Sequence, residues 1–201
     1  MAATPFDLVI EQGRTLEQVV RWETEPFLYA QIQSISNSAP VTIETVAPHG
    51  IPDGWRVAVV GAKGLTSLNS VGNPPKPKDF IRASAKTVTS IEFNAISTAL
   101  EPTYSGGGAL QFYSPASLAG CSARMDIKNK VGGVVLLGLT SLNGKLVLDA
   151  VNYRITILLS AAETAALTWK KGVYDLELES PSGVVTAILT GSVTVSQEVT
   201  T

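Results

Sequence analysis

Hydrophobic and polar residues alternate over short runs along much of the chain, which is the pattern of half-buried β-strands. Near the N-terminus, Leu16, Val20 and Trp22 fall on one face of such a run, with Glu17 and Arg21 on the other. The same period of two recurs in three later runs: Ala123–Ile127, Arg154–Leu159 and Tyr174–Leu178. These runs predict strands that place one face against a core.

The middle of the chain has denser loop signals and shorter apolar runs. Gly- and Pro-rich stretches at 47–50, 52–54, 72–77 and 105–108 predict loops. The strands expected between these loops are Ile32–Ser36, Val41–Thr45, Arg56–Val60, Phe80–Ala83, Ser90–Phe93 and Leu110–Phe112. Strands of this length, separated by turns, are typical of a small β-barrel.

Turn and cap signals divide the last third of the chain. Asn143-Gly144 predicts a two-residue type I′ hairpin turn, because that turn needs positive φ at both positions. Ser160-Ala-Ala-Glu163 matches a capping box and predicts a short helix over Ala161–Leu167. Gly191 predicts a break before a last strand that reaches Val199.

Together these elements predict an all-β protein with one short helix. We expect an antiparallel β-sandwich, immunoglobulin-like or jelly-roll-like, that carries an inserted small β-barrel. The sandwich is expected to be discontinuous in sequence and to consist of residues 1–29 and 113–201. The barrel is expected to occupy residues 30–112.

Composition and charge limit the kinds of molecule that this protein is expected to bind. Among 201 residues, 45% are hydrophobic and 16% are charged, which favours a folded core over disorder. The net charge is −2 and the Lys and Arg residues are scattered, so we expect no nucleic-acid partner. The apolar runs are far shorter than the roughly 20 residues that span a bilayer, so we expect no membrane partner. Met1–Ile10 lacks the pattern of a secretory signal, which favours synthesis and folding in a cytoplasm.

Candidate chemistry is sparse. The chain has one histidine, His49, and one cysteine, Cys121, which argues against a cysteine-based zinc site. His49 precedes Gly50 in a predicted loop, and no sequence feature supplies the partner that a general base needs. The acidic residues Glu11, Glu17, Glu23 and Glu25 are spaced by even numbers, as on the outer face of one strand. We therefore expect no enzyme activity, no cofactor and no metal site.

Three aromatic residues are candidates for contact with a partner. Trp55 lies beside the turn signal Pro52-Asp53-Gly54, where it is either a core residue or an exposed contact. If exposed, Trp55, Tyr104 and Tyr113 would suit a protein interface or stacking on a sugar.

Motifs of the outer region resemble a module common in tailed-phage structural proteins. They follow one another in the order of that module: Ile10–Gly13, Val20–Trp22, Ala123–Ile127, Thr164–Leu178, Gly172–Thr186 and Gly191–Val199. The region is similar to the N-terminal domain of upper baseplate proteins of siphophages. The resemblance covers residues 6–29 and 113–201 and implies a sandwich there.

The middle region resembles a different fold. The pattern His49–Gly54, Val57–Val59, Gly61 and Gly64-Leu65, followed by Leu68-Asn69, is similar to the small β-barrel called the first-catalytic-cysteine half-domain of ubiquitin-activating enzymes. This resemblance implies a barrel and no activity, because neither a catalytic cysteine nor an adenylation motif accompanies it.

The first hypothesis is therefore a structural protein of a tailed-phage virion, in the tail, baseplate, neck or capsid surface. It would be assembled in the host cytoplasm and would act by contacts with other virion proteins, as a homo-oligomer in a symmetric assembly. The second hypothesis is a carbohydrate-binding module for host adsorption. A third, a cell-wall hydrolase, lacks a visible acid–base pair.

Overall fold

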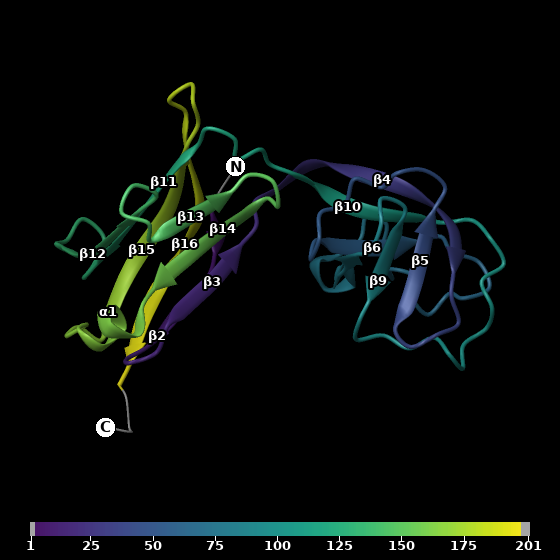
Figure 1. Ribbon diagram of the computed structural model, residues 1–201, viewed down its shortest axis with the longest axis horizontal. Helices are drawn as coiled ribbons and strands as arrows, with labels where there is room; N and C mark the ends of the chain where they lie inside the picture. The colour runs from purple at the N-terminus through teal and green to yellow at the C-terminus, as the bar shows by residue number, and fades with distance from the viewer. Residues whose placement is uncertain (1–2, 198–201) are drawn as a thin grey trace. The chain divides into compact units, whose positions relative to one another are not determined.

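The computed structural model describes residues 3–197, and its regular secondary structure is almost entirely β-strand, with one short α-helix (Figure 1). The predicted all-β class is confirmed. Contacts divide the chain into two compact units. The first, here called the sandwich unit, is Met1–Trp22 with Ser117–Thr201, and the second, the barrel unit, is Glu23–Ala116.

The boundaries between the units differ from the predicted ones, which followed residues 29 and 112. Strand β4 (Glu23–Ile35) pairs antiparallel with β10 (Ala109–Pro115), and the pairing extends as far as Glu23 opposite Pro115. Both strands therefore belong wholly to the barrel unit, and the predicted boundaries fall inside paired strands.

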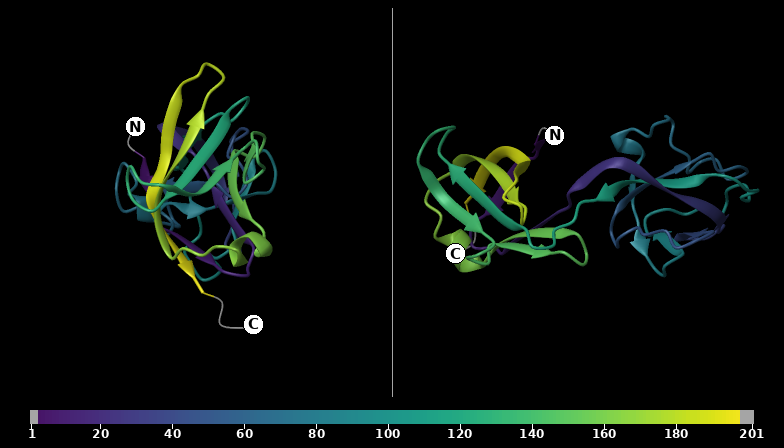
Figure 2. Two further views of the ribbon diagram at one scale, coloured as in Figure 1. Left: turned by 90° about the vertical axis from the view of Figure 1, so that its left-hand side faces the viewer. Right: turned by 90° about the horizontal axis from the view of Figure 1, so that it is seen from above.

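The sandwich unit has two sheets. The larger sheet has the order β1 (Thr4–Pro5), β16 (Val185–Ser196), β15 (Lys171–Glu179), β11 (Ser122–Lys128) and β12 (Val135–Thr140), and β2 (Leu8–Glu11) also pairs with β16. The smaller sheet has the order β13 (Leu146–Asp149), β14 (Arg154–Leu159) and β3 (Leu16–Val20). The sandwich is not purely antiparallel, because β1 and β2 run parallel to β16. Figure 2 shows the β15–β16 pair and the β13–β14 hairpin in separate layers.

The core of the sandwich comes from the inward positions of the alternating runs. Met125, Ile127 and Leu176 of the larger sheet and Ile155 and Ile157 of the smaller one have no exposed surface. Full burial of such a side chain stabilises the fold by about 1.5–3 kcal/mol. The period-two pattern therefore identified the strand faces that pack against each other in the core between the two sheets.

The capping box is confirmed, and the helix that it begins is shorter than predicted. The Glu163 amide donates to Ser160 Oγ at 3.3 Å, and the Ser160 amide donates to the Glu163 carboxylate at 2.9 Å. Helix α1 spans Ala161–Ala165 rather than continuing to Leu167. The Leu167 side chain packs into the core and its carbonyl accepts from the Gln12 side chain, which draws the chain away from the helical path.

Two turn predictions in the sandwich unit are wrong. Asn143-Gly144 does not close a hairpin, because β12 and β13 belong to different sheets, and only Gly144 has a positive φ, of 74°. Gly191 does not break a strand, since β16 runs through it. A Cβ on Gly191 would lie 2.1 Å from the Phe6 carbonyl oxygen, so glycine here permits close approach of β1. Val199, placed in the last strand by the sequence pattern, lies outside the described residues.

The barrel unit is one curved sheet. Its strand order is β7 (Ile81–Arg82), β6 (Arg56–Val60), β10, β4, β5 (Val41–Thr45), β9 (Ser90–Phe93) and β8 (Ser84–Ala85). The end strands β7 and β8 are separated in sequence by Ala83 alone, so the chain itself nearly closes the barrel (Figure 1). Ala83 is buried, and its amide donates to the Trp55 carbonyl at 2.9 Å. A single-turn 3-10 helix, η1 (Pro77–Asp79), precedes β7.

Candidate functional site

Trp55 is a core residue and not a surface contact. Its side chain has no exposed area, and its Nε1–H donates to the Tyr113 carbonyl at 2.9 Å. The reading of Trp55 as an exposed residue that stacks on a sugar is therefore wrong. The indole therefore lies inside the barrel. Burial of this large apolar ring stabilises the barrel most when its N–H has a hydrogen-bond partner.

Tyr104 fastens a glycine-rich loop. Its hydroxyl donates to the Gly107 carbonyl at 2.7 Å and also lies 3.3 Å from the Ile32 carbonyl. Burial raises the pKa of this hydroxyl. The ring is half-buried, and its polar end is already used within the barrel, so Tyr104 is poorly placed to bind a ligand.

Tyr113 belongs to a cluster of three aromatic rings on the barrel unit. Phe27 lies opposite Tyr113 in the pairing of β4 with β10, and their ring centroids are 4.3 Å apart. Phe80, which follows η1, lies 5.4 Å from Tyr113 and 6.1 Å from Phe27. All three residues are half-buried. Of the three predicted contact residues, Tyr113 therefore belongs to an aromatic cluster that is partly accessible.

An ion pair lies near this aromatic cluster. Arg56 Nε donates to Glu23 at 2.9 Å, and a second guanidinium nitrogen completes a two-point contact. The hydrogen bond with Glu23 raises the pKa of Arg56, and the electrostatic interaction with Tyr113 raises it further. The sequence indicated none of these neighbours, because β4, which holds Glu23 and Phe27, and β6, which holds Arg56, are brought together only by β10, which pairs with both strands.

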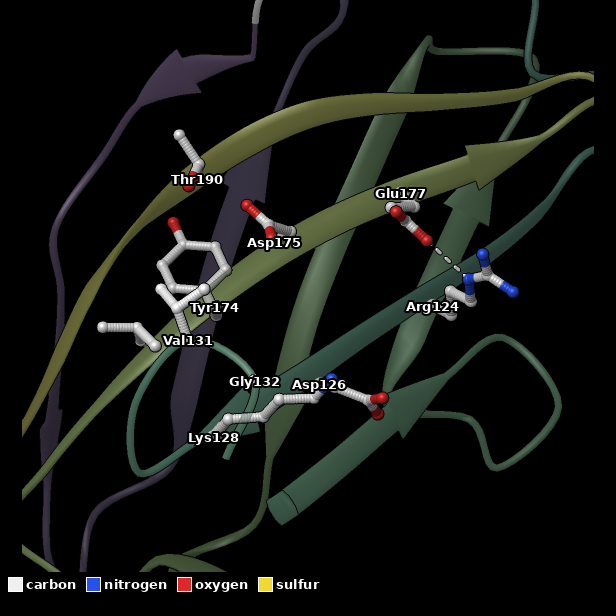
Figure 3. Close-up of a pocket in the computed structure, with 10 residues that line it drawn as sticks. Arg124, Asp126, Lys128, Val131, Gly132, Tyr174, Asp175, Glu177 and Thr190 are labelled. Atoms are coloured by element: carbon white, nitrogen blue, oxygen red, sulfur yellow. Dashed lines mark hydrogen bonds and ion pairs between the residues drawn. The ribbon is translucent and has the colours of Figure 1, made fainter. Parts of the chain in front are cut away.

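The outer face of the larger sandwich sheet carries a groove of about 290 Å³. It is lined by Arg124, Asp126 and Lys128 of β11, Val173, Tyr174, Asp175 and Glu177 of β15, Thr190 of β16, and Val131 and Gly132 of the loop between β11 and β12 (Figure 3). Arg124 Nε donates to the Glu177 carboxylate at 2.6 Å across the two strands. The groove therefore has charged walls of both signs and one apolar margin.

The apolar margin continues into the tip of the β11–β12 hairpin. Val131 is 89% exposed, Val134 is 71% exposed and Val135 is 46% exposed. The tip is ordered by its own hydrogen bonds, because the Asn129 side chain accepts from the Val134 amide at 3.0 Å. We call these three valines the valine tip. Val134 and Val135 begin a run of mostly apolar residues that continues to Leu139, and such a run does not reveal that its first residues are exposed.

His49 joins two loops of the barrel unit. Its Nδ1 accepts from the Ile51 amide at 2.9 Å, and Nε2 lies 3.0 Å from the Thr87 carbonyl, to which it donates. His49 lies in a loop, as the sequence predicts, and both of its ring nitrogens form hydrogen bonds with the main chain. The two loops line a second groove, of about 420 Å³, made by residues 48–51 and 85–88. We call it the His49 groove.

The four acidic residues with even spacing do not share a strand. Glu11 lies in β2 and Glu17 in β3, whereas Glu23 and Glu25 lie in β4 of the other unit. Over residues 3–197, no group of three or more His, Cys, Asp or Glu side chains is placed to hold a metal ion. Within the same residues, no helix is long and apolar enough to cross a membrane.

The structure thus has three candidate sites: the aromatic cluster, the groove with its valine tip, and the His49 groove. Comparison of the chain with protein-family models finds no matching family, and comparison with curated proteins finds no relative.

Proposed function

We propose that this protein is a structural component of a tailed-phage particle and acts by protein–protein assembly. Its partners would be other virion proteins and further copies of itself in a symmetric assembly, with neither nucleic acid nor membrane involved. It would reach the virion by assembly in the host cytoplasm, in the tail, baseplate, neck or capsid surface. The observation that carries the proposal is the valine tip beside the charged groove of the sandwich unit.

The valine tip has the chemistry of a docking surface. Protein interfaces combine an apolar centre with a polar or charged rim. Here Val131, Val134 and Val135 supply the apolar part, and Arg124 and Asp126 belong to the charged walls next to it. Covering apolar surface is favourable by roughly 25 cal/mol per Å². A partner that covers the tip would gain this energy, and the charged walls would select its orientation.

The position of the phage-like motifs supports the virion part of the proposal. The motif Ala123–Ile127 lies in β11, which pairs with β15, where the motif Gly172–Thr186 begins. The strand β15 pairs with β16, and β16 pairs with β2, where the motif Ile10–Gly13 begins. Motifs that are distant in sequence are thus adjacent in one sheet, as the segments of a single shared module would be.

The experiment is incorporation into particles. The gene would be deleted from its phage and supplied as variants, and purified particles would be examined by mass spectrometry. We expect the wild-type chain in particles and at least a tenfold loss with Val134→Asp, which puts a charge on the valine tip. The control is Val151→Asp, since Val151 is 85% exposed in the turn between β13 and β14. Absence of the wild-type chain from particles would refute the proposal.

The second candidate function is carbohydrate binding, favoured by the aromatic cluster of the barrel unit. Half-buried rings beside Glu23 and Arg56 offer both a stacking surface and polar partners for hydroxyl groups. A glycan array decides it, with Tyr113→Ala as the test and Tyr29→Ala as control, because Tyr29 is 64% exposed on β4. Binding that is lost only with Tyr113→Ala would support this function. No binding by the wild-type chain would exclude it for the glycans tested.

A further inference from the structure

One loop of the barrel unit presents a leucine to solvent. Leu100 is fully exposed, yet its loop is held on both sides, because the Asn37 side chain donates to the carbonyls of Thr98 and Glu101 at 3.1 and 2.8 Å. Thr98 is itself buried, and its hydroxyl donates to the Ser36 carbonyl at 2.6 Å. A single exposed leucine is ordinary. An ordered loop, however, loses little conformational entropy when it docks.

The His49 groove offers an apolar receptor on the same unit. Pro48, Ile51, Ala85 and Val88 contribute to its lining, and Lys86 is the charged residue in it. The two loops that form it are pinned by His49, so the groove exists without a ligand. Preformed, mostly apolar concavities with few polar groups are the usual form of a binding site.

The Leu100 loop and the His49 groove lie at opposite ends of β5. Near the start of β5, the Val41 amide donates to the Ile96 carbonyl and the Thr98 amide donates to Ser38. Near its end, the Thr45 amide donates to the Thr89 carbonyl and the His49 amide donates to Val88. The first and last Cα atoms of this five-residue strand are four residue steps apart, about 14 Å at 3.4 Å per step. A contact between this loop and this groove therefore has to join two copies.

The charges at the two ends are complementary. Glu101 follows Leu100 and is exposed, while Lys86 lies in the groove with its side chain 49% exposed. Lys86 also pairs with Glu92 of its own chain at 3.1 Å, which fixes its position without covering it. Opposite charges at an interface set its register and discourage wrong pairings.

We propose that copies of this chain associate head to tail, with the Leu100 loop of one copy in the His49 groove of the next. Glu101 of the first copy then faces Lys86 of the second. This inference rests on the proposed function, since it names the second copy as a partner. A heterologous contact of this kind forms a ring if the rotation closes and a filament if it does not. One such contact is small, so its strength comes from repetition.

The test is sedimentation velocity of the full chain over a range of concentrations. We expect the wild-type chain to show concentration-dependent association. Leu100→Asp, Glu101→Lys and Lys86→Glu should each weaken it about tenfold, which corresponds to about 1.4 kcal/mol. An equimolar mixture of Glu101→Lys and Lys86→Glu chains should restore association, because every contact between the two different variants again joins opposite charges. Lys78→Glu, at an exposed position of the same unit, is the control.

The outcomes separate this inference from the proposed function. Because Lys86→Glu places a second carboxylate near Glu92, its thermal unfolding is measured too, and Leu100→Asp gives a version that disturbs no internal contact. A monomeric wild-type chain at all concentrations would overturn the inference, as would a mixture that fails to restore association. If particles still incorporate the Leu100→Asp chain but lose the Val134→Asp chain, assembly through the valine tip stands and the head-to-tail contact fails.

Discussion

The side chain of Asn143 donates to the main-chain carbonyl of Gly138 at 3.1 Å. Its oxygen also accepts from the amides of Thr140 at 2.9 Å and Lys145 at 3.1 Å. Gly138 and Thr140 belong to β12, the last strand of the larger sheet. An open edge of this kind invites pairing with other chains. Asn143 occupies the place that a neighbouring strand would take.

Replacing Asn143 should therefore weaken the sandwich and expose its edge. Asn143→Ala leaves the Gly138 carbonyl and two amides to water, and we expect the free energy of unfolding to fall by about 1 kcal/mol. We also expect more light scattering on heating. Asn143→Asp keeps the acceptor and loses only the donor to Gly138, so its effect should be smaller. Equal stability and scattering for the alanine variant and the wild type would show that the edge does not depend on this side chain.

The same side chain shows where sequence reading succeeded and where it stopped. Four strands have the predicted bounds, since their apolar alternation and flanking turns are local signals: Val41–Thr45, Arg56–Val60, Ser90–Phe93 and Arg154–Leu159. The Asn143-Gly144 pair was read as a hairpin turn because the sequence does not show that its flanking strands belong to different sheets. The hydrogen bonds of the Asn143 side chain are themselves local, to Gly138, Thr140 and Lys145, but the turn that they fix leads from one sheet to the other.

Non-local pairing also decided the candidate sites. Phe27 and Tyr113 meet because β4 pairs with β10 in one register, and no local pattern carries that information. The parallel pairing of β1 with β16 was missed for the same reason, although Gly191 marked the place where Phe6 approaches. The sequence left Trp55 as either a core or a surface residue. The structure places it in the core, directly before β6, where its carbonyl accepts from the amide of Ala83.

Trp55→Phe should destabilise the barrel unit while leaving the sandwich unit protected. The change removes the N–H that satisfies the Tyr113 carbonyl and leaves a void in the core. Together these cost about 2–4 kcal/mol. Hydrogen exchange should become faster in β6 and β10, with β15 unchanged. Tyr29→Phe, at an exposed position on β4, is the control. Faster exchange spread equally over both units would contradict the prediction.

Glu163 should contribute to stability in an acid-sensitive way. The Lys145 ammonium, followed by the Ser160 amide and hydroxyl, lowers the pKa of Glu163 from 4.5 to about 2. Because the folded-state pKa is the lower one, the contribution is complete above pH 4.5 and is lost as the pH falls toward 2.

The comparison is urea unfolding of the wild type and Glu163→Gln between pH 6 and pH 2. Glutamine retains the capping-box geometry and loses the charge. We expect the wild type to have the higher urea midpoint at pH 6, and we expect the difference to shrink as the pH falls. A difference that does not change with pH would mean that the carboxylate charge is not its source.

Tyr174 should make the stability of the fold sensitive to alkaline pH. Its hydroxyl donates to the Phe6 carbonyl at 2.8 Å. Burial, together with the Asp7 and Asp175 carboxylates, raises the pKa of Tyr174 from 10.0 to about 12. Here the folded state holds the proton more tightly, so the contribution is complete below pH 10 and is lost as the pH rises toward 12.

Tyr174→Phe isolates this effect, because every other alkaline titration is shared with the wild type. At pH 7 the variant should be less stable by about 1 kcal/mol, since the Phe6 carbonyl loses its donor. Between pH 10 and pH 12 the wild type should lose stability faster than the variant, and the two unfolding curves should converge. The Phe6 segment also contacts Gly191, so loss of the hydroxyl should speed hydrogen exchange along β1 first. Parallel alkaline slopes for the two proteins would show that the Tyr174 proton is not linked to folding.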